Sequence, residues 1–186
     1  MALNPAPINP SPLGSRRNRK TGKPKYKQGY FIPQNPKKYV GQTPIAYRSS
    51  WEQVFCNWCD LNEKVSKWST ESIVIQYQMS ELDGSIKNHR YIPDFYVELI
   101  SPNDPEKHDR MVIELKPFKD TKPPEPPKRE TTKMYENYAY SMKTYKTNLY
   151  KWAYAKDWCE RRHMKFVIIT ENDLINRGIL KNKSKK

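Results

Sequence analysis

The sequence predicts an α/β domain with a mixed central sheet flanked by helices. Along the chain a helical pattern is followed by three strand-like segments, a second helical region and a last short apolar strand. This order is typical of a sheet covered by helices, and no internal repeat competes with it. The 186 residues leave room for one domain with a substantial core, plus extensions at its ends.

The chain is strongly basic. Lysine and arginine number 34 against 20 acidic residues, which gives a formal net charge of +14. Such a surplus favours a polyanionic partner, most commonly nucleic acid, although basic tails on an ordinary soluble protein would also produce it. No run approaches the roughly 18 apolar residues of a membrane span, and the first residues do not resemble a secretory signal. Three cysteines, an odd number, favour a reducing compartment, so we expect a cytoplasmic protein with no membrane partner.

The N-terminal segment, residues 1–29, is rich in proline, asparagine, glycine and basic residues. It lacks apolar periodicity, so it is expected to be a flexible basic arm. Binding DNA and docking another protein are both open roles for it. The folded domain is expected at residues 30–175, beginning with an extended segment from Tyr30 to Tyr47, and residues 176–186 are expected to form a basic tail.

The first helix is expected to begin after Ser49. Ser49 and Glu52 have the spacing of a capping box, in which each side chain binds a backbone amide of the first turn. Apolar residues then recur at helical spacing and predict a buried stripe: Trp51, Val54, Phe55, Trp58 and Leu61. Glu52 lies off that stripe, on the face it shares with Cys56 and Cys59.

Strand-like segments occupy the middle of the chain. Residues 71–79 predict a strand, and the Asp-Gly pair within residues 82–85 indicates a hairpin turn. Residues 90–100 and 111–118 predict two further strands, joined by a charged loop at residues 101–109. The proline-rich stretch 117–130 cannot be helix or central strand, and it is either a DNA-facing flap or an inert spacer.

Two acidic residues lie where a buried sheet should have none. Asp94 follows Pro93 at the head of one strand, and Glu114 lies inside the next, two residues before Lys116. Side chains alternate across a strand, so Glu114 and Lys116 share a face. Burying these charges is costly unless something compensates, and a magnesium ion between Asp94 and Glu114 would do so. An exposed ion pair of Glu114 and Lys116 is the alternative.

The second helical region spans residues 131–162, with a stripe formed by Tyr138, Met142, Tyr145, Leu149, Trp152 and Cys159. Asn148 could divide it into two helices. Residues 166–170 predict a short strand, and a last helix is expected to begin near Glu171.

These motifs resemble the PD-(D/E)XK nuclease superfamily, and within it the head completion nucleases of T-even-type bacteriophages and the related TnsA-type endonucleases. The segments that carry the resemblance are Tyr47–Glu52, Ile92–Leu99, Val112–Pro117 and Asn148–Leu174. The resemblance implies a restriction-endonuclease-like core. It also implies a DNA endonuclease that acts in head completion and virion assembly after DNA packaging, located in the host cytoplasm and the virion.

The resemblance also implies a role for each site residue. Glu52, Asp94 and Glu114, with the carbonyl of Leu115, would bind Mg²⁺, for which Mn²⁺ is expected to substitute. Lys116 would orient or activate the attacking water. Arg48, Lys119 and Lys151 are expected to contact double-stranded DNA, and phage head or neck (portal-vertex) proteins are the expected protein partners.

Four alternatives stay open on the sequence. A structural virion protein could keep the nuclease fold only to bind DNA or the neck, and a resolvase or restriction-type nuclease is a weaker option. Glu52 could be a helix cap and not a ligand. Cys56, Cys59, Cys159 and His163 could form a zinc set, although a helical C-x-x-C has poor geometry for zinc.

Overall fold

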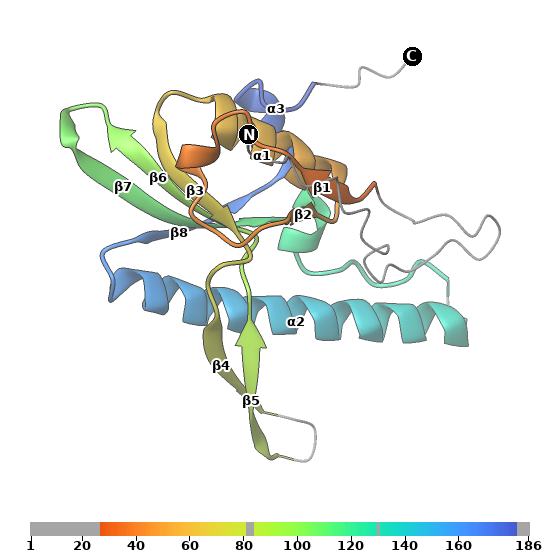
Figure 1. The fold of residues 1–186 in the computed structure, drawn as a ribbon. Coiled ribbons are helices and arrows are strands. Elements are labelled where there is room, and N and C mark those ends of the chain that lie inside the picture. Colours follow the sequence, from red (N-terminus) through yellow and green to blue (C-terminus); the bar gives the residue numbers. More distant parts are fainter. Residues whose placement is uncertain (1–26, 81–83, 130, 182–186) are drawn as a thin grey trace.

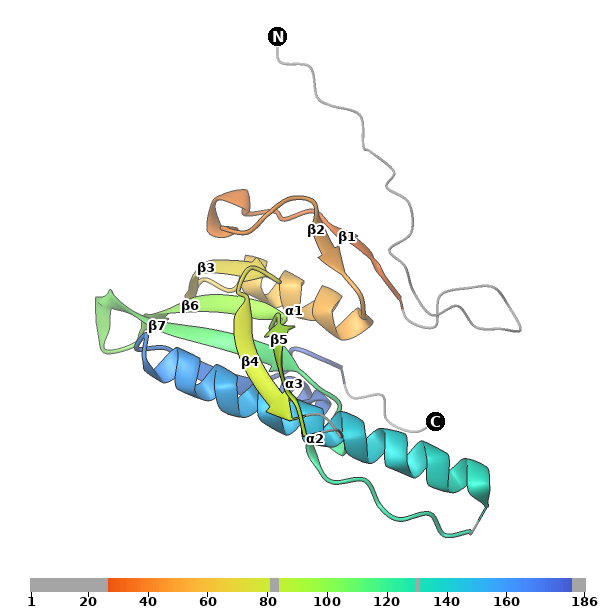
Figure 2. The same ribbon diagram turned by 90° about the horizontal axis from the view of Figure 1, so that it is seen from below.

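The computed structural model describes residues 27–80, 84–129 and 131–181. Most of the proposed N-terminal arm, part of the turn at 82–85 and the last five residues lie outside these ranges. The described chain forms a mixed α/β fold, as expected, built on a four-stranded central sheet with the order β3-β6-β7-β8 (Figures 1 and 2). Strand β3 (Val65–Thr70) pairs antiparallel with β6 (Phe95–Ser101), β6 pairs antiparallel with β7 (Asp104–Leu115), and β7 pairs parallel with β8 (Lys165–Ile169).

Helices cover both faces of this sheet. In Figure 1, α1 (Ser50–Leu61) lies above it with the short α3 (Glu171–Asn176), and the long α2 (Thr132–Glu160) runs below it. The core on the α1 side includes Phe55, Trp68 and Phe95, all almost fully buried. None of the described helices is both long and apolar enough to cross a membrane.

Two small antiparallel sheets extend the fold. Strands β1 (Gly29–Phe31) and β2 (Ile45–Tyr47) form a ribbon beside α1, and Ile45 reaches the core. Strands β4 (Ile75–Ser80) and β5 (Ile86–Tyr91) form a hairpin that crosses α2 and projects from the body (Figures 1 and 2). Ile75, Tyr77 and Tyr91 of this hairpin and Ala155 of α2 form a second buried cluster on the α2 side.

Several predicted strands differ from the observed ones. The segment at 71–79 does contain a strand, β4, but it belongs to the hairpin and not to the central sheet. Residues 90–100 form two strands, because the chain leaves β5 at Tyr91 and enters β6 only at Phe95. The prediction of a charged loop at 101–109 was mostly wrong, because β7 already begins at Asp104. The first residues of β7 are exposed and belong to a long β6–β7 hairpin.

The helices begin as predicted, but the residues that they bury differ from the predicted apolar stripes. In α1 the fully buried residues are Phe55, Cys56, Cys59 and Asp60, whereas Leu61 is exposed. The face shared by Glu52 and the two cysteines is therefore the one that faces the sheet. Helix α2 continues through Asn148 without a break, and Asn148 is buried whereas Leu149 is exposed.

The described chain contacts the body near both ends of the expected domain. Gly29 already pairs with Tyr47 in the β1–β2 ribbon. At the other end, Ile179 and Leu180 pack against the α1-side core, and their backbone amides bind the carbonyl of Leu174. The chain therefore stays in contact with the body beyond residue 175.

Candidate active site

Asp94 and Glu114 lie opposite each other at one end of the central sheet. The register pairs Phe95 with Ile113, so the next residues along, Asp94 and Glu114, face each other where β6 begins and β7 ends. Phe95 and Ile113 point into the α1-side core, which directs their neighbours to the opposite face. Glu114 is buried there, with only 8% of its surface exposed.

Hydrogen bonds hold both carboxylates in place. The backbone N–H of Leu115 donates to Asp94 Oδ2 at 2.7 Å, which joins the two strand ends. The hydroxyl of Tyr91 donates to Glu114 Oε2 at 2.8 Å, and Lys116 Nζ lies 3.5 Å from Glu114 Oε1. Lys116 is itself fixed at the edge of the sheet, because its N–H donates to the carbonyl of Ile169 on β8. Asp94, Glu114, Leu115 and Lys116 thus come together as the sequence predicted.

The two acids are electrostatically crowded. Burial, followed by the charge of Glu114, raises the pKa of Asp94 well above its usual range, and the charge of Glu52 adds to this. The hydrogen bond from Leu115 and the charge of Lys116 oppose the shift without cancelling it. A further positive charge between Asp94 and Glu114 would relieve this repulsion.

Glu52 approaches the pair from α1 and also supports the start of that helix. Ser49 Oγ accepts a hydrogen bond from the Glu52 backbone at 3.1 Å, as a cap should. Glu52 Oε2 accepts instead from the N–H of Arg48 at 2.7 Å, one residue before the cap. Burial raises the pKa of Glu52. Capping and electrostatic contact with Asp94 therefore coexist in this side chain.

The three acids do not form a ready-made metal cage. In the described ranges, no three His, Cys, Asp or Glu side chains are arranged closely enough to hold a metal ion. The donor set that fits a hard divalent cation is the facing pair Asp94 and Glu114, with the Leu115 carbonyl beside them. Magnesium commonly takes only one or two protein carboxylates and completes its shell with water and substrate phosphate.

The zinc alternative was wrong. Cys56, Cys59, Cys159 and His163 all belong to the described part of the chain, and they do not form a cluster that could hold a metal ion. Cys56 and Cys59 are buried in the core on the α1 side, whereas Cys159 belongs to α2 beneath the sheet (Figure 1). All three cysteines are free, and His163 is exposed.

The basic residues predicted to contact DNA occupy different surroundings. Lys151 of α2 lies over the ring of Tyr91, 5.7 Å from its centre, and is thus joined to Glu114 through that tyrosine. Arg48 makes a two-pronged ion pair with Glu71 at 3.0 and 3.2 Å. Lys119 lies in the short 3-10 turn η2 (Phe118–Thr121), which follows β7.

Two supporting residues escaped the sequence analysis. Tyr91 is buried and ends β5, 23 positions before its partner Glu114, and nothing in the sequence signals that contact. Glu71 follows β3 with a positive φ of 45°, and its N–H donates to the carbonyl of Asp94. Non-glycine residues with such backbone angles concentrate at functional sites, but the sequence does not reveal them.

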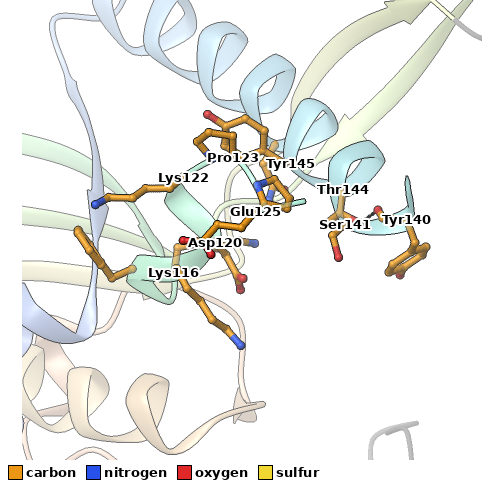
Figure 3. A pocket seen from close by; sticks show the side chains of 13 residues that line it. Lys116, Asp120, Lys122, Pro123, Glu125, Tyr140, Ser141, Thr144 and Tyr145 are labelled. Carbon is orange, nitrogen blue, oxygen red and sulfur yellow. Dashed lines mark hydrogen bonds between the residues drawn. The ribbon is translucent and has the colours of Figure 1, made fainter. Parts of the chain in front are cut away.

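Cavities flank the strand end at Leu115–Pro117. One, of about 470 Å³, is lined by Arg48, the start of α1 with Glu52, and Leu115. The larger, of about 720 Å³, lies between Lys116, η2 with the proline-rich loop, and α2 (Figure 3). The two cavities therefore adjoin the candidate site at Glu52 and Leu115 on one side and at Lys116 on the other.

Comparison with known proteins identifies relatives of this chain. The family model described as "TnsA-like endonuclease N terminal" matches residues 62–171, which contain Asp94, Glu114 and Lys116. The "Head completion nuclease" of Enterobacteria phage T4 is 35% identical over 147 residues, covering 78% of this chain and 92% of that protein. No solved structure matches significantly.

Proposed function

The chain belongs to the TnsA-like endonuclease family, and from this membership and the geometry of the site we propose that it is a magnesium-dependent DNA endonuclease. The observation that carries the proposal is the facing pair Asp94 and Glu114 with Lys116 beside it, at the end of two paired strands. A structural protein has no physical need to hold like charges together in a buried place.

Each residue of the site would contribute a different part of phosphodiester hydrolysis. A divalent cation, when bound, supplies a water of lowered pKa and neutralises the non-bridging phosphate oxygens. Asp94 and Glu114 would hold it, with Leu115 contributing its carbonyl. Tyr91 fixes one oxygen of Glu114 and leaves the other facing Lys116. The ammonium of Lys116 lies where it can orient a water and stabilise negative charge on the phosphate.

We infer the biological process in which this chain acts from the name of its phage T4 relative. The T4 protein is named a head completion nuclease, and we propose that this chain likewise acts on DNA during completion of a phage head. Its substrate would be double-stranded DNA, its partners phage head or neck proteins, and its location the host cytoplasm and the virion. The surplus of basic residues supports the DNA partner.

A cleavage assay tests the proposed function. The purified chain, incubated with supercoiled plasmid and with branched DNA, should nick them in the presence of Mg²⁺ or Mn²⁺ and leave them intact in EDTA. DNA binding without cleavage under all metal conditions would contradict the enzymatic role and favour the structural virion protein.

Glu52 is expected to act on catalysis more than on stability. Glu52→Gln retains an oxygen that can accept the Arg48 amide, so the melting temperature should stay nearly unchanged. It removes a negative charge near Asp94, so magnesium affinity and cleavage should fall about tenfold or more. Calorimetry and a magnesium titration of cleavage measure the two effects. Ser49→Ala is the opposite control, costing about 1 kcal/mol of stability while most activity persists. Normal cleavage by Glu52→Gln would reduce Glu52 to a cap.

Tyr91 is expected to position Glu114. Tyr91→Phe removes only the hydroxyl that binds Glu114 Oε2, and the loss should lower magnesium affinity or cleavage about tenfold to a hundredfold. A magnesium titration of the cleavage rate provides the measurement. Tyr96→Phe is the matched control, because it removes an equivalent Tyr–Glu hydrogen bond, to Glu98 at 2.6 Å, away from the site. Equal effects of both changes would make Tyr91 merely structural.

A further inference from the structure

The cavity of about 720 Å³ beside Lys116 has the features of a ligand site. It begins at the end of β7 and extends between the proline-rich loop and α2. Figure 3 shows Lys116 on one side, with Ser141, Thr144 and Tyr140 of α2 on the other. Its volume falls within the range of about 300–1,000 Å³ that small-molecule sites occupy. We propose that it binds one unpaired nucleotide of the DNA, next to the phosphate that is cleaved.

Asn148 is the strongest sign that the cavity takes a ligand. It lines the cavity from the middle of α2, is only 5% exposed, and stands at a position where the helix would otherwise bury an apolar side chain. No hydrogen bond joins its side-chain amide to a described residue, and the amide atoms are not fully buried, so they remain open to the cavity. Asparagine is a poor helix former, and nothing in the packing of α2 requires a polar side chain here. A ligand that offers both donors and acceptors would satisfy it, as a nucleobase edge does.

The walls suit a flat ring. Phe118, Pro123 and Pro124 form one side and Tyr145 and Tyr140 the other, so the cavity is mainly apolar with aromatic surfaces. Aromatic side chains are the usual platforms on which unpaired bases stack. Three lysines line the cavity with two acids, and Lys116 lies closest to the catalytic pair. The aromatic walls, the Asn148 amide and the lysines suit, in turn, the ring, the polar edge and the phosphate of a nucleotide.

The base must be unpaired to enter. In an intact duplex the bases are stacked and paired, and a protein reaches an individual ring face only after the nucleotide leaves the stack. Removing a paired base is costly, whereas a tail or branch point offers one without that cost. This inference rests on the proposed function and makes DNA with an unpaired nucleotide beside the cleavage site its preferred substrate.

A binding comparison tests the inference independently of cleavage. The full chain is titrated in EDTA with a blunt duplex and with the same duplex carrying a short thymidine tail, using fluorescence anisotropy. The tailed duplex should bind about tenfold more tightly. Asn148→Leu, an apolar replacement of similar size, should remove this preference while the affinity for the blunt duplex is kept. Its melting temperature should be unchanged or higher, because leucine is the better helix former and no hydrogen bond to a described residue is lost.

A second variant and a control complete the test. Tyr140→Ala changes an exposed wall residue and should also weaken the preference for the tail. Tyr150→Ala removes an exposed tyrosine of the same helix that does not line this cavity, and it should retain the preference. Equal binding of both duplexes by the native chain would overturn the inference. So would an unchanged preference, or a clearly lower melting temperature, in Asn148→Leu.

The two proposals can fail separately. If the chain cleaves plasmid DNA but binds tailed and blunt duplexes equally, the nucleotide site is wrong and the endonuclease stands. If it prefers the tailed duplex through Asn148 but cleaves no DNA with magnesium, the nucleotide site stands and the endonuclease is wrong.

Discussion

Asp94→Asn and Glu114→Gln should each abolish magnesium-dependent cleavage, lowering the rate about a thousandfold or more, while the chain stays folded. Each change removes one of the two facing charges that would hold the cation. The amide side chains preserve the local contacts, because the new glutamine can still accept from the Tyr91 hydroxyl and the new asparagine from the Leu115 amide. Since repulsion between the acids is relieved, the melting temperature without metal should hold or rise.

Plasmid nicking rates and thermal melts in EDTA measure these effects. The matched control is Glu98→Gln on β6, whose carboxylate also accepts a tyrosine hydroxyl but lies away from the catalytic pair. That variant should cleave normally. Cleavage at the native rate by either Asp94→Asn or Glu114→Gln would disprove the assignment of the site.

Lys116→Ala should impair turnover far more than metal binding. Its ammonium lies beside Glu114 Oε1 and would orient the water or stabilise the phosphate, and a positioned group of this kind contributes about a hundredfold or more. The single-turnover cleavage rate at saturating magnesium should therefore fall by about that factor, whereas the magnesium concentration for half-maximal activity should change little.

The control for this change is Lys67→Ala. Lys67 also lies near a glutamate, 3.9 Å from Glu98, but on β3 away from the site, and its loss should leave the rate unaltered. If Lys116→Ala cleaves at the native rate, the lysine only pairs with Glu114 and takes no part in the reaction.

The strand-end site was predictable because short-range rules place its members. Period-two alternation puts Glu114 and Lys116 on one face, and the proline before Asp94 marks a strand boundary. The α/β class followed from the order of periodic segments. The start of α1 followed from Ser49, whose hydroxyl does cap the helix. Each of these inferences depends on residues only a few positions apart.

The features that the sequence did not predict depend on irregular strands or on contacts between distant residues. The sequence does not predict strand β3, because a register shift between Val65 and Lys67 breaks the alternation of buried and exposed residues along it. The strand expected at 71–79 lies in the β4–β5 hairpin and not in the central sheet, because sequence periodicity cannot tell which strand pairs with which. Asn148 was taken for a possible helix break, since apolar periodicity does not anticipate a polar residue at a buried position.

The parallel pairing of β7 with β8 has a consequence for how the chain folds. Strands β6 and β7 are neighbours in sequence and can pair as a local hairpin, which already brings Asp94 and Glu114 together. Strand β8 joins only after α2 has crossed beneath the sheet, pairing Met111 with Lys165. Such distant pairing closes slowly because a long loop must be ordered first.

Because β8 pairs late, Lys116 is the site residue most affected, since its backbone N–H binds the carbonyl of Ile169 on β8. During folding the β6–β7 hairpin would hold the carboxylate pair while the lysine still lacks its anchor on β8. A folding intermediate without docked β8 would thus carry the two acids without a fixed Lys116. Cleaving activity would therefore require the last and slowest strand pairing of the central sheet.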